Sequence, residues 1–128
     1  MLPLLNHDLS TRLIWDCKTP VTSQIFGTIS TSKVKGFGIK SSLISTYPIT
    51  IEFRKGGEVF RNGKNPQTKS LKKYFQETAV PPWLRDRIPL IYIDNQIAAI
   101  ASYIICAAYQ AADHEVGYQI HWQPNWEY

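Results

Sequence analysis

The sequence has few of the residues from which catalytic and metal sites are usually built. Its two cysteines, Cys17 and Cys106, stand far apart, and its three histidines, His7, His114 and His121, are isolated from one another. Neither a Cys-x-x-Cys spacing nor a histidine cluster indicates zinc or a redox pair. A carboxylate pair, a Gly-x-Ser-x-Gly elbow and a Gly-x-x-x-x-Gly-Lys phosphate loop are also missing. The sequence therefore predicts no active site, no metal and two inert thiols in a reduced compartment.

Long hydrophobic runs are missing as well. The apolar start of the chain is interrupted by His7 and Asp8, which rules out the hydrophobic region of a signal peptide. Residues 97–108 are apolar but too few to span a bilayer, which needs about 20 residues. We therefore expect a cytoplasmic protein with no membrane partner.

The composition is that of a globular domain. Hydrophobic residues make up 44% of the 128 residues and charged residues 19%, far from the composition of disordered chains. A chain of this length forms one core. We expect a single domain over residues 1–128, with residues 1–45 as a strand-rich lead-in, because Gly27, Gly36 and Gly38 separate segments rich in β-branched and aromatic residues.

The middle of the chain changes from a strand pattern to a helix pattern. Residues 49–54 alternate apolar and polar, residues 55–57 form a turn, and residues 59–60 are expected to return as the second strand of a hairpin. From Lys69 to Glu77 the period is helical, with Leu71, Tyr74 and Phe75 on one face. The opposite face is basic and contains Lys69, Lys72 and Lys73. Thr68 is the predicted N-cap.

The last third is expected to be mainly strand. Pro81 and Pro82 end the helix, and Pro82 starts a short turn. Residues 90–93 form a buried strand, followed by a tight turn at residues 94–95. Periodicity allows strand or helix for residues 97–106, and the preceding turn favours strand. Residues 117–122 alternate and form the last strand.

Positive charge is concentrated between Ile51 and Arg87. This segment has nine basic and four acidic residues, a net of +5, whereas the whole chain carries +4. The basic residues are Arg54, Lys55, Arg61, Lys64, Lys69, Lys72, Lys73, Arg85 and Arg87. Lysines one helical turn apart can contact successive nucleic-acid phosphates and release condensed counterions. A solvated lysine face is the alternative, and the basic loop ahead of the helix leaves the two interpretations evenly balanced.

Three other features each allow two interpretations. Gly56 and Gly57 fit a plain hairpin turn better than a close approach to a phosphate. Trp83 is favoured as a core anchor over a base-stacking platform. The run from Arg85 to Arg87 could clamp a phosphate or form a local ion network, and the sequence does not decide between these. His121 is expected at the surface or rim.

Three segments, IEFRKGGEVFR, KSLKKYFQE and VPPWLRDRIPLIY, in this order and spacing, resemble the C-terminal domain of bacterial tRNA(Ile)-lysidine synthetase. The resemblance extends over residues 49–124. Residues before Lys40 are similar to the family only in having strand-like segments separated by glycines. It implies an α+β fold, a β-sandwich-like mixed sheet with one or two short helices packed against it. That fold is similar to a domain of the phenylalanyl-tRNA synthetase β-subunit.

The resemblance also implies a function. The family uses ATP to adenylate a cytidine in the anticodon of a minor isoleucine tRNA and then joins lysine to it. This chemistry belongs to an N-terminal catalytic domain, whose Ser-Gly-Gly-x-Asp-Ser signature is absent from these residues. We therefore expect this chain to be a fragment that is inactive alone and holds no cofactor, while ATP and magnesium bind the missing catalytic domain.

In that family the C-terminal domain binds tRNA at the end of the acceptor stem. The resemblance makes Arg54, Arg61, Lys69, Lys72 and Lys73 candidates for phosphate contacts, and the charge pattern adds Lys64 and Arg85. Lys64 stands where the family usually has arginine. About five neutralised phosphates would give a slope of roughly −4 for log affinity against log salt. The alternative function is a protein-interaction module that docks onto the catalytic domain, with an incidental basic face.

Overall fold

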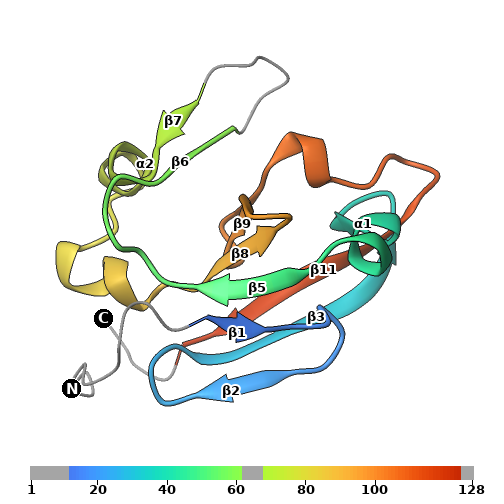
Figure 1. Ribbon diagram of the computed structural model, residues 1–128, viewed down its shortest axis with the longest axis horizontal. Helices are drawn as coiled ribbons and strands as arrows, with labels where there is room; N and C mark the ends of the chain where they lie inside the picture. The colour runs from blue at the N-terminus through green and yellow to red at the C-terminus, as the bar shows by residue number, and fades with distance from the viewer. Residues whose placement is uncertain (1–11, 62–67, 125–128) are drawn as a thin grey trace.

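A computed structural model describes residues 12–61 and 68–124 of the chain. Two antiparallel sheets pack face to face, and a small ribbon with one helix stands at one end (Figure 1). The five-stranded sheet has the order β1 (Leu13–Ile14), β5 (Ile49–Glu52), β8 (Leu90–Ile93), β9 (Gln96–Ile100) and β10 (Ile104–Ile105). The four-stranded sheet has the order β2 (Val21–Ser23), β3 (Gly27–Lys35), β11 (Val116–Gln123) and β4 (Ile39–Lys40). The ribbon pairs β6 (Val59–Phe60) with β7 (Lys69–Ser70).

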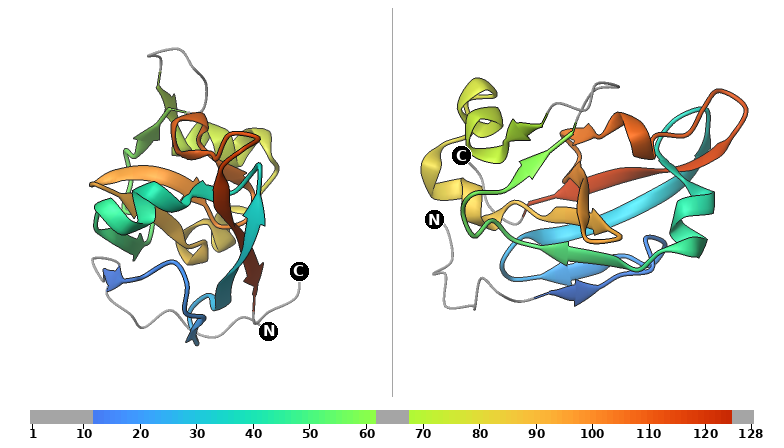
Figure 2. Two further views of the ribbon diagram at one scale, coloured as in Figure 1. Left: turned by 90° about the vertical axis from the view of Figure 1, so that its right-hand side faces the viewer. Right: turned by 45° about the horizontal axis from the view of Figure 1, so that its top comes forward.

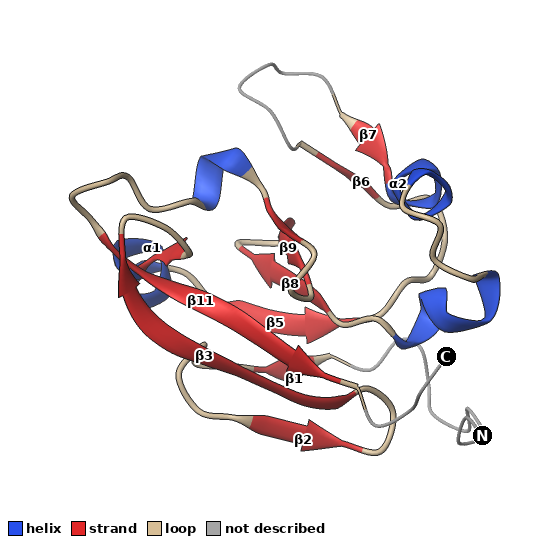
Figure 3. Cartoon of the chain, turned by 180° about the vertical axis from the view of Figure 1, so that it is seen from behind, coloured by secondary structure: helices blue, strands red, loops and turns tan. Residues whose placement is uncertain are grey.

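Short helices complete the fold (Figure 3). They are α1 (Ser41–Thr46), α2 (Leu71–Glu77) and the 3-10 helices η1 (Pro82–Arg87) and η2 (Ala107–Tyr109). The α+β class and the sandwich-like arrangement with short packed helices are confirmed. Every strand pair among the described residues is antiparallel, so strand direction in the sheets is not mixed.

The main core lies between the two large sheets. The apolar face expected for residues 49–54 is confirmed, because Ile49, Ile51 and Phe53 are buried there. The polar face is not outside as expected, since Glu52 is only 8% exposed. From the other sheet, Ile29 and Ile120 contribute to the same cluster. These residues bury one face of each sheet, the arrangement that a period of two produces.

A second core covers the outer face of the five-stranded sheet, so the expectation of one core is wrong. The apolar face predicted for α2 is confirmed, since Leu71, Tyr74 and Phe75 are buried in this cluster. Leu84 of η1 and Leu90 of β8 join them. Strand β8 is thus covered on both sides, which explains its continuous apolar sequence. Figure 2 shows α2 and η1 together at this end of the sheet.

The hairpin predicted between residues 49–54 and 59–60 is wrong. Strand β5 pairs with β1 and β8, while β6 pairs with β7. The turn exists, because the Glu58 carboxylate accepts hydrogen bonds from the backbone N–H groups of Lys55 (2.7 Å) and Gly56 (2.9 Å). Both edges of β5 are already occupied, so the chain leaves the sheet after this turn instead of folding back on it.

The start of the basic helix also differs from the prediction. Lys69 belongs to β7, and α2 begins at Leu71. The predicted N-cap, Thr68, is wrong: the Ser70 hydroxyl oxygen accepts the backbone N–H of Lys73 at 3.0 Å. The ribbon keeps Lys69 and Ser70 extended, so the cap lies at the first residue after which the backbone is free to turn.

The strands of the last third are confirmed with one change. Asp94 and Asn95 form the tight turn between β8 and β9 with φ of 52° and 65°. The segment 97–106 is strand rather than helix, but Ala101, with φ of 43°, turns the chain so that β10 pairs back onto β9. Strand β11 extends the predicted residues 117–122 by one residue at each end.

Several side chains lie where the sequence did not place them. The core interpretation of Trp83 is wrong, because the side chain is 64% exposed while its neighbour Leu84 occupies the core. His121 is exposed, as expected. Burial raises the pKa of Cys17 to about 12 and that of Cys106 to about 11, which fits unreactive thiols. Within the described ranges, no helix has the length and apolarity needed to cross a membrane.

Candidate nucleic-acid interface

The predicted contact residues gather around one part of the molecule. We define the basic lobe as the β6–β7 ribbon with Arg61 and Thr68, helix α2, and η1, which lie together at one end (Figure 1). The lobe contains Arg61, Lys69, Lys72, Lys73 and Arg85. Arg54, after β5, is tied to η1 through Asp86. Lys64 lies outside the described residues.

Lys72 and Lys73 are the most available cations of the lobe. Both are exposed on the first turn of α2, and the opposite face of that helix is buried. Neither has an acidic group within 4.0 Å among the described residues. Two positive charges in the first turn oppose the helix macrodipole by a few tenths of a kcal/mol each, roughly. Lys72 and Lys73 therefore stand at helix positions where a positive charge slightly lowers the stability of the helix.

Lys69 is in an ion pair. Its Nζ donates to Glu77 Oε2 at 2.6 Å and lies 6.0 Å from the centroid of the Tyr74 ring. This hydrogen bond is the main cause of the lowered pKa of Glu77. Surface pairs of this kind are weak and exchange readily. Glu77 therefore already offsets the charge of Lys69.

Two half-buried arginines, Arg54 beside the lobe and Arg85 within it, are also held by protein groups. Arg54 Nε donates to Asp86 Oδ1 at 3.0 Å, and both side chains are partly exposed. Arg85 Nε donates to the Val80 carbonyl at 3.0 Å. Arg87 is 5% exposed, and burial lowers its pKa. The run 85–87 is therefore divided: Asp86 joins an ion pair with Arg54, and Arg87 lies inside the protein.

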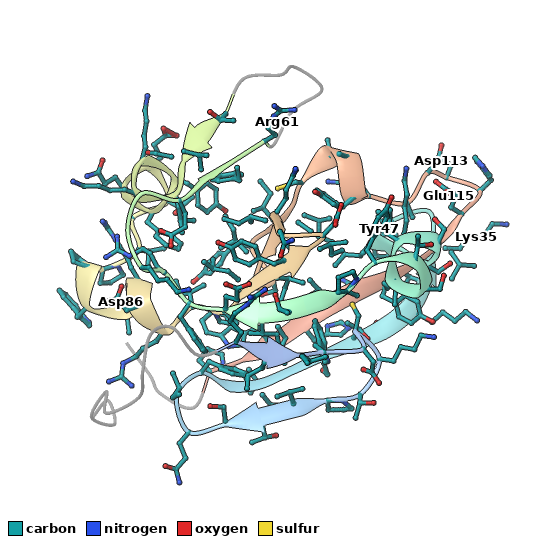
Figure 4. The ribbon with its side chains drawn as sticks, viewed as in Figure 1. Lys35, Tyr47, Arg61, Asp86, Asp113 and Glu115 are labelled. Carbon is teal, nitrogen blue, oxygen red and sulfur yellow. The ribbon has the colours of Figure 1, made fainter. Side chains whose placement is uncertain are left out.

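Arg61 is exposed at the end of β6. Figure 4 shows it at the top of the molecule, with Asp86 at the left edge and Lys35, Tyr47, Asp113 and Glu115 at the right. Arg61 and the α2 lysines are thus separate from the acidic residues Asp113 and Glu115. The described part of the lobe offers three exposed cations, Arg61, Lys72 and Lys73, without an acidic partner within 4.0 Å, while Lys69 and Arg85 are half-buried and bound to protein groups.

A second group of lysines was missed by the sequence reasoning. Lys33 and Lys35 are exposed on β3, and Tyr118 of β11 is opposite Lys33. Lys18 Nζ lies 5.9 Å from the centroid of the Tyr118 ring. The alternation of Lys33 and Lys35 along a strand was a usable signal, because residues two apart share a face. Positive charge is therefore not confined to the basic lobe.

Comparison with known proteins identifies the family. Residues 49–122 match the family described as the TilS substrate C-terminal domain. A tRNA(Ile)-lysidine synthase of Coxiella burnetii is 42% identical over 98 residues, which are 77% of this chain and 22% of that protein. The one of Methylococcus capsulatus is 32% identical over 123 residues, 95% of this chain and 28% of that protein. The one of Legionella pneumophila strain Paris is 53% identical over 58 residues, 44% of this chain and 13% of that protein.

The chain spans about a quarter, or less, of the length of these relatives. The matched residues include β5, the basic lobe, β8, β9 and nearly all of β11. The family match therefore covers more than half of the chain, all of the second core and part of the main core. The chain belongs to the TilS substrate C-terminal domain family.

Proposed function

We propose that this chain is the tRNA-binding domain of a cytoplasmic tRNA(Ile)-lysidine synthase and that it contacts the acceptor-stem end of the tRNA through backbone phosphates. The family match and the names of the relatives support this role. In such a protein the ligase chemistry, with ATP and magnesium, takes place in a separate N-terminal catalytic domain. The present chain then acts by holding the tRNA for that partner domain.

The observation that carries the proposal is the pair Lys72 and Lys73. Their helix is fixed by its buried face, so both ammonium groups have a stable base from which to reach solvent. Each is a compact charge on a flexible stem, suited to phosphate contacts that do not depend on base sequence. With Arg61, they form the part of the proposed surface that requires no rearrangement.

The remaining candidates contribute less. Lys69 and Arg54 are already paired with Glu77 and Asp86, so these carboxylates offset part of the positive charge that either side chain brings to a phosphate. Arg85 is half-buried and bound to a carbonyl oxygen. We therefore propose about three net phosphate contacts rather than five, and a salt slope of about −3 rather than about −4.

This slope can be measured by filter binding of the 128-residue chain to tRNA at several salt concentrations. We expect log affinity to fall linearly with log salt with a slope of about −3. The Lys72→Glu, Lys73→Glu double variant should lose most binding and keep its folded circular dichroism spectrum, because both side chains are exposed. A flat salt response would contradict the proposal.

A matched control reverses two lysines far from the basic lobe. Lys33→Glu with Lys35→Glu makes the same change in net charge on β3. We expect a smaller loss of affinity from this control than from the α2 variant. Equal losses would mean that total charge, and not the basic lobe, determines binding.

Docking onto a catalytic domain is a second candidate function, and one observation favours it. Trp83 is 64% exposed and Val59, also in the basic lobe, is 54% exposed. Exposed tryptophan is common at the centre of protein interfaces. Trp126, an aromatic near the end of the chain that could serve the same purpose, lies outside the described residues. The two functions are compatible within one enzyme.

A further inference from the structure

A cleft lies between the basic lobe and the five-stranded sheet. It has a volume of about 430 Å³ and is bordered by β6 with Arg61, by the β8–β9 turn, and by η2. In Figure 1 the ribbon stands over the end of the β8–β9 hairpin, with the helical turn after β10 beside it. Three segments distant in sequence therefore form the walls. The volume is within the range of small-ligand sites, roughly 300–1,000 Å³.

The walls combine aromatic rings with amide groups. Tyr92 of β8 and Tyr109 of η2 are half-buried and line the cleft. Asn95 and Gln96, at the hairpin turn, add donors and acceptors, and the Tyr109 hydroxyl donates to Gln96 Oε1 at 3.4 Å. Aromatic faces that stack a base, together with amides that bind its edge, are the usual means of recognising unpaired nucleotides.

The charges of the cleft favour an anionic ligand that also has a neutral ring. Arg61 is exposed at the outer end of β6 and is the only cation among the described lining residues. The Glu58 carboxylate also borders the cleft, but both its oxygens accept backbone N–H groups of the preceding turn. Burial, with the negative charges of Glu58 and Glu52, raises the pKa of Tyr92 to about 12, so its hydroxyl remains a donor at neutral pH.

We propose that this cleft binds one unpaired nucleotide of the RNA, with the base against Tyr92 and Tyr109 and the phosphate against Arg61. A base-paired stem is too wide to enter a cleft of this volume, whereas a single unstacked nucleotide fits. The inference rests on the proposed tRNA-binding function and extends it: the exposed lysines hold the paired backbone, and the cleft takes a nucleotide that has left the stack.

The test compares RNA hairpins that share one stem and differ only at the end. One is blunt, one has a single-stranded 3′ overhang, and one has a 5′ overhang. We expect at least one overhang form to bind the 128-residue chain about tenfold more tightly than the blunt form, the size of one base–aromatic stacking contact. Whichever overhang gains affinity identifies the end that supplies the nucleotide.

Tyr109→Leu keeps an apolar side chain and removes the ring and hydroxyl. We expect it to abolish the overhang advantage while leaving blunt-hairpin affinity and the salt slope unchanged. Tyr47→Leu is the matched control, because Tyr47 is 40% exposed and does not line the cleft. Asn95→Gly provides a second cleft variant, since glycine accepts the positive φ of this turn, and it should reduce the same advantage.

The outcomes separate this inference from the function on which it rests. If none of the three hairpins binds with salt dependence, the proposed function fails and the nucleotide site fails with it. If all hairpins bind equally with a slope of about −3, phosphate binding holds and the cleft inference is overturned. If the cleft variants instead weaken association with an N-terminal catalytic part and leave the overhang preference intact, the cleft holds a polypeptide, which also overturns it.

Discussion

At the scale of single residues, acidic partners determine how much of the lobe's charge can reach RNA. Arg54 and Lys69 were equal to Lys72 and Lys73 as sequence candidates, because all four are basic residues of matching segments. The structure separates them, since Asp86 lies 3.0 Å from Arg54 and Glu77 lies 2.6 Å from Lys69. These contacts join residues 32 and eight positions apart, across different elements, so no local pattern reveals them.

Asp86→Asn should therefore increase tRNA affinity. The asparagine oxygen can still accept from Arg54, but the negative charge that offsets the guanidinium is removed. We expect the salt slope to become more negative by about 1, as for one additional phosphate contact. Filter binding measures this change. Asp113→Asn, which removes the same charge at the opposite end (Figure 4), should have less effect, and an equal effect would show that only net charge matters.

At the scale of elements, the buried face of α2 was predictable and its first residue was not. Leu71, Tyr74 and Phe75 repeat at helical spacing, so the local sequence is sufficient to predict which face of the helix packs. The start depends on β7, which exists only because β6 lies beside it. Both Thr68 and Ser70 are suitable capping residues, and tertiary pairing selects Ser70.

Ser70→Ala should lower the free energy of unfolding by about 1 kcal/mol, because it removes the acceptor for the backbone N–H of Lys73. Thr68→Ala, the matched control, should change it by no more than a few tenths of a kcal/mol, roughly, because Thr68 is exposed and caps no helix. Urea denaturation measures both values. A larger loss from Thr68→Ala would contradict the cap assignment.

At the scale of the whole molecule, the basic lobe is built on the outside of the sandwich and exposes more than charge. Helices α2 and η1 cover the sheet with Leu71, Phe75 and Leu84, and this covering leaves Trp83 outside. A tryptophan next to prolines was favoured as a core residue. The 3-10 helix instead turns Leu84 inward and leaves Trp83 facing solvent.

Trp83→Ser therefore tests whether the lobe docks onto a catalytic domain. We expect it to weaken association with the N-terminal part of the protein in a pull-down, with no loss of thermal stability, since the side chain packs little within the chain. Ile14→Ser, at a site 91% exposed on β1, is the matched control and should leave association unchanged. Unchanged association in Trp83→Ser would eliminate docking through this residue.

The sequence by itself determined the faces and the turns: the apolar face of β5, the apolar side of α2, the Asp94–Asn95 turn and the excess of positive charge around the lobe. Each of these features depends on residues within a few positions of one another. Their spacing in the sequence determines which residues share a face of a strand or helix. Only the tertiary structure decided which strand pairs with β6, which cations have acidic partners, and where the cleft lies. Those features require segments far apart in the chain to meet, and which segments meet depends on the edges and faces that the rest of the fold leaves open.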